Sequence, residues 1–185
     1  LGPIFKASEK YIKSPHPTPR LLKMVRPKPS GEHLEFEIIL APDFVKRKFS
    51  QTFKDPFDVF FPFHEPNLLL ASKNGEVDIY GYLSKSDGYC ALITATAPFY
   101  SMAGRLRPLL QQLNDYGVSY VEILMAMDSI LSLETLLDVN FLPSAIYPAM
   151  LEYEGKFMDL VLMSRSMEPL NFRGMQIEKT FKPYI

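Results

Sequence analysis

Residues 89–127 read YCALITATAPFYSMAGRLRPLLQQLNDYGVSYVEILMAM, and they contain the elements that decide the fold. The apolar run YCALITATA is typical of a buried central strand. Leucines then recur at helical spacing behind the loop that begins at Pro98. Gly117 follows as a helix-ending residue, and VSYVEILMAM predicts the next strand. The stretch therefore predicts strand, loop, helix and strand, the order of an α/β domain built around a ligand cleft.

Upstream of this stretch the pattern predicts further strands and one short helix. Residues 34–40 alternate between apolar and polar side chains, as in a strand with one face on a core. A helix follows, with Asp43 as its expected N-cap. Residues 67–97 predict a meander, in which Asn74-Gly75 forms a type I′ hairpin turn and residues 84–88 form a second turn.

Downstream of it the sequence predicts a second helix and a closing hairpin. Asp128 or Ser129 begins the helix, and Asn140 ends it because asparagine tolerates left-handed backbone. The helix residues expected to point inward are Ile130, Leu133, Leu136 and Leu137. Two strands then follow, joined around residues 154–156.

Length and composition limit the classes of protein to which the chain can belong. Its 185 residues allow one domain with a substantial core. A net charge of -1 gives no argument for nucleic acid or an anionic membrane as partner. No apolar run approaches the ~20 residues of a membrane span. Cys90 is the single cysteine and no Cys/His cluster has metal-ligand spacing, so we expect a cytoplasmic protein without a metal site.

Residues 1–31 differ from the rest, because they are rich in proline, lysine and arginine. They form either an extended arm or linker on the surface of the domain or a basic arm that contacts a partner. We expect the folded domain to comprise residues 32–185. Since the chain starts at Leu1 rather than Met, we also expect a fragment or processed product, such as the C-terminal module of a longer protein.

The loop before the first leucine-rich helix carries a family motif. Residues 98–106, PFYSMAGRL, resemble the P-x-Tyr-Arg-x-x-Gly-x-Gly/Ala loop of the GNAT superfamily of acyl-CoA-dependent N-acyltransferases. Pro98, Tyr100 and Gly104 match the motif. Ser101 and Leu106 depart from it, and Leu106 either crowds the phosphates or points inward as the first leucine of the helix.

A second motif follows at the end of the second helix. GNAT proteins commonly have Tyr-x-x-x-Gly-Phe there, and then a hairpin that ends in Asp-x-x-x-Met. Phe141, Asp159 and Met163 match, whereas Leu136 and Asn140 replace the tyrosine and the glycine. The resemblance is clearest over residues 67–166. It implies an α/β fold of the α+β type, with a mixed, mostly antiparallel central sheet and helices on both faces.

The resemblance implies acetyl-CoA or a related acyl-CoA as co-substrate, without a metal. Pyrophosphate is best held by the backbone N–H groups at a helix start, where the helix dipole is positive. The thioester is expected near Ala95 and Ala97, on the strand before the loop. The expected contacts on the loop are Ser101, Met102, Ala103, Gly104 and Arg105.

Acyl transfer to an amine needs a base for the amine and an acid for the thiolate that leaves. Glu122 lies in an apolar strand and is either a polar position on a half-exposed face or the base. His64 and Glu65 belong to a Phe/Pro-rich loop that, by resemblance, lies near the acceptor, although a structural role is the alternative. Tyr147 and Tyr153 are candidate replacements for the tyrosine missing at position 136.

Two functional hypotheses follow. The first is an N-acyltransferase that acts on a small-molecule or peptide amine. The second is a catalytically inactive GNAT-like module that senses a ligand or binds other domains of a larger protein. A cleft between the strands 89–97 and 118–127 with Glu122 facing it favours the enzyme, whereas a cleft plugged by Leu106 or by the arm favours the module. The exposed edge of the closing hairpin can support a homodimer, and neither nucleic acid nor a membrane is an expected partner.

Overall fold

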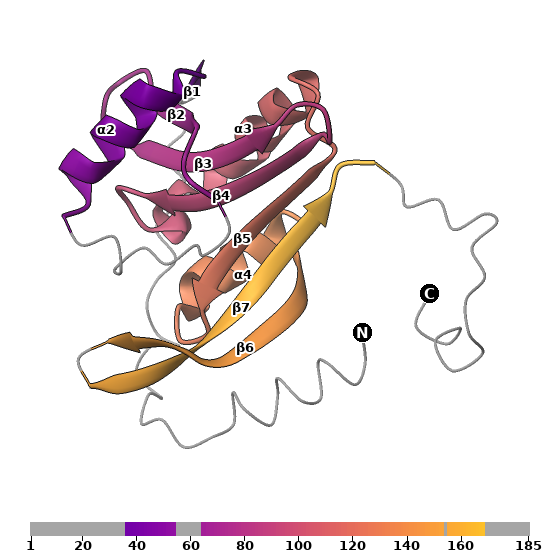
Figure 1. The fold of residues 1–185 in the computed structure, drawn as a ribbon. Coiled ribbons are helices and arrows are strands. Elements are labelled where there is room, and N and C mark those ends of the chain that lie inside the picture. The colour runs from indigo at the N-terminus through magenta and orange to yellow at the C-terminus, as the bar shows by residue number, and fades with distance from the viewer. Residues whose placement is uncertain (1–35, 55–63, 154, 169–185) are drawn as a thin grey trace. The chain divides into compact units, whose positions relative to one another are not determined.

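The computed structural model describes residues 36–54, 64–153 and 155–168 (Figure 1). All of them belong to one compact unit that spans residues 28–169. The predicted arm 1–31 lies outside the described residues. So do residues 55–63 of the Phe/Pro-rich loop and residues 169–185 of the predicted domain.

Seven strands form one sheet in the order β1-β2-β3-β4-β5-β7-β6. Every pair of neighbours is antiparallel except β4 and β5, which are parallel. The predicted mixed, mostly antiparallel sheet is therefore confirmed. The strand bounds are β1 (Phe36–Ile39), β2 (Leu68–Ser72), β3 (Asp78–Ser84), β4 (Tyr89–Ala95), β5 (Tyr120–Ala126), β6 (Leu142–Tyr153) and β7 (Lys156–Ser166).

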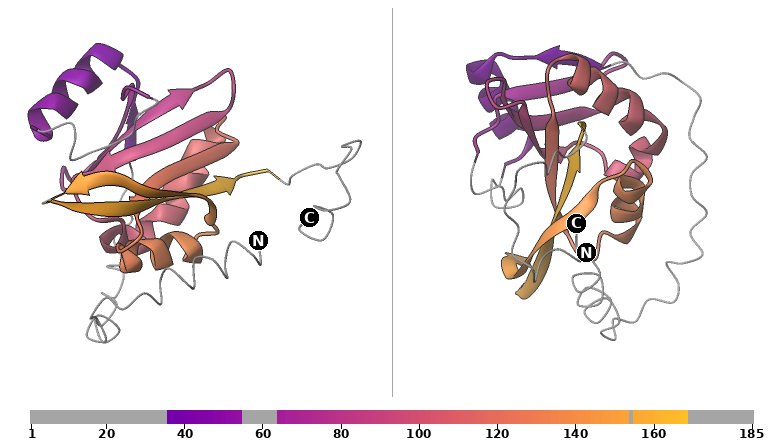
Figure 2. Two further views of the ribbon diagram at one scale, coloured as in Figure 1. Left: turned by 60° about the horizontal axis from the view of Figure 1, so that its bottom comes forward. Right: turned by 90° about the vertical axis from the view of Figure 1, so that its right-hand side faces the viewer.

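Helices lie on both faces of this sheet (Figure 2). On one face, α2 (Pro42–Thr52) buries Val45 against Leu69 and Tyr80. On the opposite face lie α3 (Ala103–Asp115), the 3-10 helix η3 (Phe99–Met102) in front of it, and α4 (Ile130–Asp138). We call these the α2 face and the α3 face; the larger hydrophobic core lies on the α3 face.

The leucine stripe of α3 is the central part of that core. Its four leucines are at most 2% exposed: Leu106, Leu109, Leu110 and Leu113. The helix ends before Gly117, whose φ of +96° suits glycine and confirms the predicted stop. Pro108 lies inside the helix and not in its first turn, so α3 lacks the hydrogen bond that residue 108 would donate to Gly104. The exposed backbone of Gly104 can bind water there instead.

Two local expectations upstream of the core are wrong. The N-cap of α2 is Ala41, and Asp43 lies in the first turn because Pro42 occupies the first helical position, where no N–H is needed. The loop at Asn74-Gly75 is not a type I′ turn, since only Gly75 has a positive φ. Its Asn74 Oδ1 instead accepts the N–H of Glu76 at 3.2 Å.

The inward face of α4 also differs from the prediction. Ile130 and Leu137 are 42% and 40% exposed, whereas Ser132, Thr135 and Leu136 are buried. Thr135 tolerates burial because its hydroxyl donates to the Leu131 carbonyl at 2.8 Å. Ser129 precedes the helix and Asn140 follows it with φ +65°, as expected.

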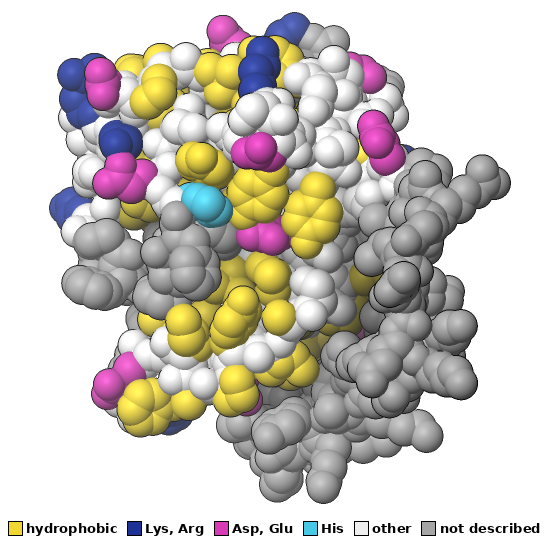
Figure 3. Space-filling view, turned by 45° about the vertical axis from the view of Figure 1, so that its right-hand side comes forward, with side chains coloured by type: hydrophobic (Ala, Val, Ile, Leu, Met, Phe, Trp, Pro, Cys, Tyr) yellow, Lys and Arg dark blue, Asp and Glu magenta, His cyan; other side chains and the backbone are white. Residues whose placement is uncertain are grey.

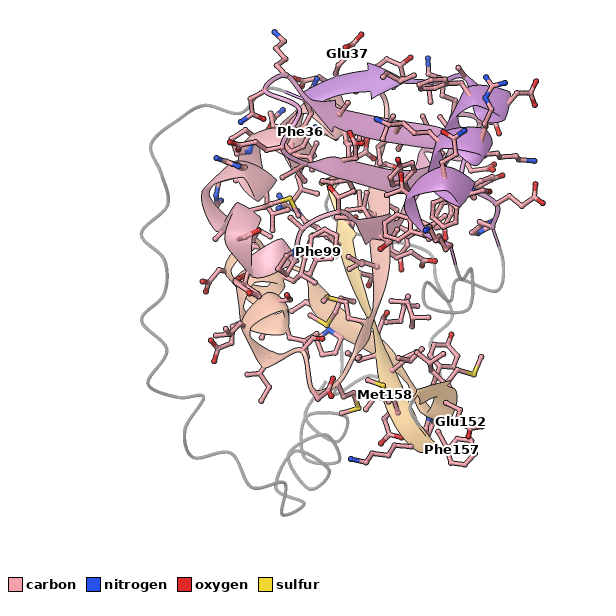
Figure 4. The ribbon with its side chains drawn as sticks, turned by 90° about the vertical axis from the view of Figure 1, so that its left-hand side faces the viewer. Phe36, Glu37, Phe99, Glu152, Phe157 and Met158 are labelled. Carbon is pink, nitrogen blue, oxygen red and sulfur yellow. The ribbon has the colours of Figure 1, made fainter. Side chains whose placement is uncertain are left out.

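The closing hairpin of β6 and β7 is confirmed, and β6 is an edge strand of the sheet. Its register shifts between Tyr147 and Leu151, where Ala149 has a φ of +50°. The Ala149 N–H donates to Asp159 Oδ1 at 2.8 Å, so the carboxylate that matches the family motif stabilises this irregularity. Figure 4 shows Glu152, Phe157 and Met158 together at the far end of the hairpin, away from β1 and α3.

The two leucines Leu113 and Leu137 provide a matched test of this core. Leu113 is fully buried, so Leu113→Ala should lower the free energy of unfolding by about 2–5 kcal/mol. Leu137→Ala, at a 40% exposed position, should lower it by less than about 1 kcal/mol. Urea denaturation of both variants measures the difference. Equal losses would contradict the observed orientation of α4.

Candidate active site

A β-bulge in β4 opens the centre of the sheet. The consecutive residues Tyr80 and Gly81 of β3 pair with Thr94 and Leu92, which leaves Ile93 as an extra residue in β4. The two strands approach closely at this point. A Cβ on Gly81 would lie 2.7 Å from the carbonyl oxygen of Ala91, so only glycine fits.

Beyond the bulge, β4 and β5 separate. Their pairing runs from Tyr89↔Tyr120 to Leu92↔Ile123, and none between them follows in the described residues, although β4 continues to Ala95 and β5 to Ala126. The Thr96 N–H donates to the Asp78 carbonyl of β3 at 2.9 Å. Because successive peptide groups of a strand point to opposite edges, those of Ala95 point toward β5. The gap between the strands therefore presents backbone groups that can pair with a ligand.

The loop of the family motif connects the end of β4 to α3. Ser101, Ala103 and Gly104 are exposed, whereas Met102 is buried. Both the N–H and the Oγ of Ser101 donate to the Pro98 carbonyl, at 2.9 and 2.7 Å. No side chain caps the start of α3. Small exposed side chains at a helix start suit the approach of a phosphate.

The side chains around this loop show which way Leu106 points and which arginine lies near the start of α3. Leu106 is 2% exposed and points into the core, so it neither crowds the loop nor plugs the gap. Arg107 donates to the Asp138 carbonyl at the end of α4, at 3.2 Å. Arg105 lies at the loop, with Nη1 at 3.9 Å from Glu76 Oε2 and a side chain that is 14% exposed. Of the two arginines, Arg105 is thus the one whose guanidinium stays near the start of α3.

Glu122 lies on the α2 face of β5, on the strand that borders the gap. Its half-buried carboxylate accepts a hydrogen bond from the hydroxyl of Tyr89 on β4. Burial raises the pKa of the Tyr89 phenol well above its ordinary value, and the hydrogen bond to Glu122 raises it further. Tyr89 therefore stays protonated at physiological pH and acts as a hydrogen-bond donor to the carboxylate.

Aromatic rings surround this hydrogen bond. The imidazole of His64 stacks on Tyr82 with ring centroids 4.2 Å apart and lies 5.4 Å from the ring of Tyr89. The rings of Tyr89 and Tyr120 are nearly parallel at 6.1 Å. Figure 3 shows one face of the molecule with a histidine side chain, in cyan, and an acidic side chain, in magenta, among hydrophobic ones. We call His64, Tyr82, Tyr89, Tyr120 and Glu122 the aromatic–carboxylate cluster.

The structure brings only part of the predicted catalytic set together. Glu122 and His64 share the cluster, but Glu65 points away, with a 78% exposed side chain paired with Lys46 of α2. Tyr147 lies on β6, opposite Leu160 of β7 and two strands from Glu122. Leu136, at the place of the family tyrosine, is fully buried in the core. The side chain of Tyr153 lies outside the described part of the chain.

Sequence reasoning missed the three tyrosines of the cluster, although a signal existed. Tyr82, Tyr89 and Tyr120 occupy strand positions that alternate with core residues such as Leu83, Cys90 and Val121. Such alternation places the three rings on one face. Their proximity to each other depends on which strands pair, and this is a property of the sheet order rather than of any one segment.

Over residues 36–54, 64–153 and 155–168, no group of three or more His, Cys, Asp or Glu side chains could hold a metal ion. Within the same residues, no helix has the length and apolar character needed to cross a bilayer.

No protein-family model matches the sequence, and no curated protein matches it. Solved structures do match the fold. YncA of Salmonella typhimurium, assigned as an acetyltransferase and solved with its cofactor acetyl-CoA, has a TM-score of 0.51 at 10% identity, over 74% of this chain and 96% of its own. The spermidine/spermine N-acetyltransferase SpeG of Vibrio cholerae matches with 0.49 at 9% identity, over 71% and 94%. The ribosomal-protein-S18-alanine N-acetyltransferase of Escherichia coli matches with 0.48 at 11%, over 71% and 81%.

The chain has the fold of the GNAT superfamily of acetyltransferases. The motif resemblance implied a mixed, mostly antiparallel sheet with helices on both faces, and the structure has this sheet. Its parallel β4–β5 pair separates in front of the start of α3. The predicted fold is thereby confirmed.

The raised pKa of Tyr89 predicts how stability depends on alkaline pH. A tyrosine of the unfolded chain loses its proton near pH 10, whereas folded Tyr89 keeps it, so unfolding then releases a proton. The contribution of Tyr89 to stability is complete below about pH 10 and is lost as the pH rises further. The urea midpoint of the parent protein should therefore decrease between pH 8 and pH 10.5, and that of Tyr89→Phe should decrease less.

The exposed ring of Tyr116 provides the control for this measurement. Tyr116→Phe should retain the alkaline loss of the parent protein. An alkaline loss that is unchanged in Tyr89→Phe would show that Tyr89 does not hold its proton in the folded state.

Proposed function

We propose that this protein is an acyl-CoA-dependent N-acyltransferase that transfers an acetyl or related acyl group to a small-molecule or peptide amine. One observation carries the proposal. The gap between β4 and β5 lies between an uncapped helix start with small exposed residues and a half-buried carboxylate, Glu122, on the bordering strand. The first feature suits the phosphates of an acyl-CoA, and the second suits proton transfer from an amine.

The acyl-CoA would occupy the gap and the motif loop. Bound there, it supplies an acyl group on a thioester, which is reactive toward an amine. The backbone at Ser101, Ala103 and Gly104 would hold its pyrophosphate, with Arg105 as the neighbouring positive charge. The peptide groups of Ala95 would pair with the pantetheine arm. YncA, solved with acetyl-CoA in a similar fold, supports this assignment.

Glu122 would accept a proton from the amine, directly or through water. As the nitrogen bonds to the acyl carbon, the carbon–sulfur bond breaks and the thiolate takes a proton. The hydrogen bond from Tyr89 would keep the carboxylate in one orientation. Tyr147, on the same face of the sheet as Glu122, would donate the proton to sulfur, because Leu136 leaves the usual tyrosine position apolar.

Acyl-CoA binding is the first test. Acetyl-CoA should bind the purified chain in calorimetry, and Gly104→Trp should abolish this binding, because an indole at this exposed position covers the start of α3. Asn114→Trp adds the same ring near the other end of α3 and should leave binding unchanged. No binding at millimolar acetyl-CoA would instead favour a GNAT-like fold used for sensing or interaction.

The role of Glu122 predicts a selective loss of turnover. With an amine acceptor found by screening, Glu122→Gln should lower kcat by about 10²–10⁴-fold, because it removes the base but keeps the shape of the side chain. The affinity for acetyl-CoA should not change. Glu65→Gln, which alters an exposed carboxylate outside the cluster, should retain full activity. If both variants keep kcat, Glu122 is not the base.

A further inference from the structure

The ladder between β3 and β4 ends in a pair in which a side chain replaces a carbonyl. Ile79 of β3 faces Ala95 of β4, so Asp78 and Thr96 come next in the register. In a hydrogen-bonded antiparallel pair, two residues exchange both backbone bonds. The Thr96 N–H donates to the Asp78 carbonyl at 2.9 Å. The Asp78 N–H, however, donates to Oγ1 of Thr96, also at 2.9 Å. The hydroxyl therefore takes the place of the carbonyl of its own residue.

This replacement explains where β4 ends. A threonine hydroxyl that accepts a backbone N–H offers the chain an alternative to the strand ladder. The carbonyl of Thr96 is released from β3, and the strand stops at Ala95. The peptide group between Thr96 and Ala97 can then turn away from the sheet toward Pro98, the first residue of the motif loop. The hydroxyl thus determines the direction in which the chain enters that loop.

The start of β3, to which Thr96 binds, is held by two ion pairs. The carboxylate of Asp78 pairs with Lys48 of α2 at 2.7 Å. Two residues earlier, Glu76 Oε2 lies 3.9 Å from Nη1 of Arg105, in the first turn of α3. This short segment is therefore attached to a helix on each face of the sheet. Through its hydroxyl, Thr96 attaches the end of β4 to the same segment.

We propose that Thr96 is a positioning residue for the acyl-CoA, because its hydroxyl sets the path of the chain between the gap and the start of α3. The inference rests on the proposed acyl transfer for its ligand. The gap lies on one side of Thr96, at Ala95, and the motif loop begins on the other side, at Pro98. A ligand that contacts both parts binds more tightly when their relative orientation is fixed beforehand.

Thr96→Val tests the role of the hydroxyl with little change in the shape of the side chain. Valine cannot accept the Asp78 N–H, so this N–H should return to the carbonyl of residue 96, as in a regular ladder. The N–H of Ala97 then changes direction, which residual dipolar couplings measure in the protein without ligand. The affinity for acetyl-CoA in calorimetry should fall by about three- to tenfold, the contribution of one hydrogen bond to the competent conformation.

Two further variants separate positioning from stability. Thr96→Ser keeps the hydroxyl and should retain both the Ala97 coupling and the affinity of the parent protein. Thr52→Val, at the end of α2, removes a hydroxyl that donates to the Lys48 carbonyl at 2.9 Å and lies 3.2 Å from the hydroxyl of Tyr80. It should lower the urea midpoint but leave acetyl-CoA binding unchanged. With an amine acceptor, Thr96→Val should raise the KM for acetyl-CoA and keep kcat within about twofold.

The outcomes for Thr96 and for acyl transfer are distinct. If Thr96→Val binds acetyl-CoA as tightly as the parent protein, the positioning role is wrong and the acyltransferase stands. Loss of affinity in Thr96→Ser as well would also overturn the role of the hydroxyl. If the parent protein binds no acetyl-CoA, the acyltransferase is wrong. An Ala97 coupling that changes only in Thr96→Val would then support control of the chain path by the hydroxyl, and an unchanged coupling would overturn it.

Discussion

The extra residue in β4 is the constraint on which the functional part of this structure depends. Ile93 interrupts the ladder between β3 and β4, and the pairing of β4 with β5 stops one residue earlier, at Leu92. The sheet stays intact on both sides of the gap, because β3 holds one strand and β7 holds the other. Backbone groups that a regular sheet would use are thereby left for a ligand.

The cost of this opening is offset by packing on the α3 face. The leucines of α3 and Leu136 of α4 belong to the same hydrophobic core as residues from both halves of the sheet, among them Leu92 and Val121. This single apolar layer holds the divided sheet together. Leu106 and Leu136, which depart from the family motif, belong to this layer. At these two positions the chain has core packing where the family has polar or small residues.

The α2 face is apolar in one part and carries a carboxylate in another. Near α2 it is apolar, with Phe49 and Phe53 against Tyr80. Next to the gap it carries a carboxylate whose hydrogen-bond donor is a phenol rather than a cation. A polar group of this kind contributes little to stability, since a half-buried charge is costly. Its position beside the gap is the basis of the role in proton transfer proposed for it.

The sequence by itself determined the elements and their order. The period of the leucines made α3 a helix, Gly117 and Asn140 ended their helices, and the motif loop indicated the fold, because these signals act within a few residues. The pairing of the strands decided which residues come together at the candidate site. Glu122 follows Tyr89 by 33 residues, and the two side chains meet only because β4 and β5 are neighbours in the sheet. The bulge at Ile93 likewise exists only as a mismatch between two paired strands, so no single segment could predict it.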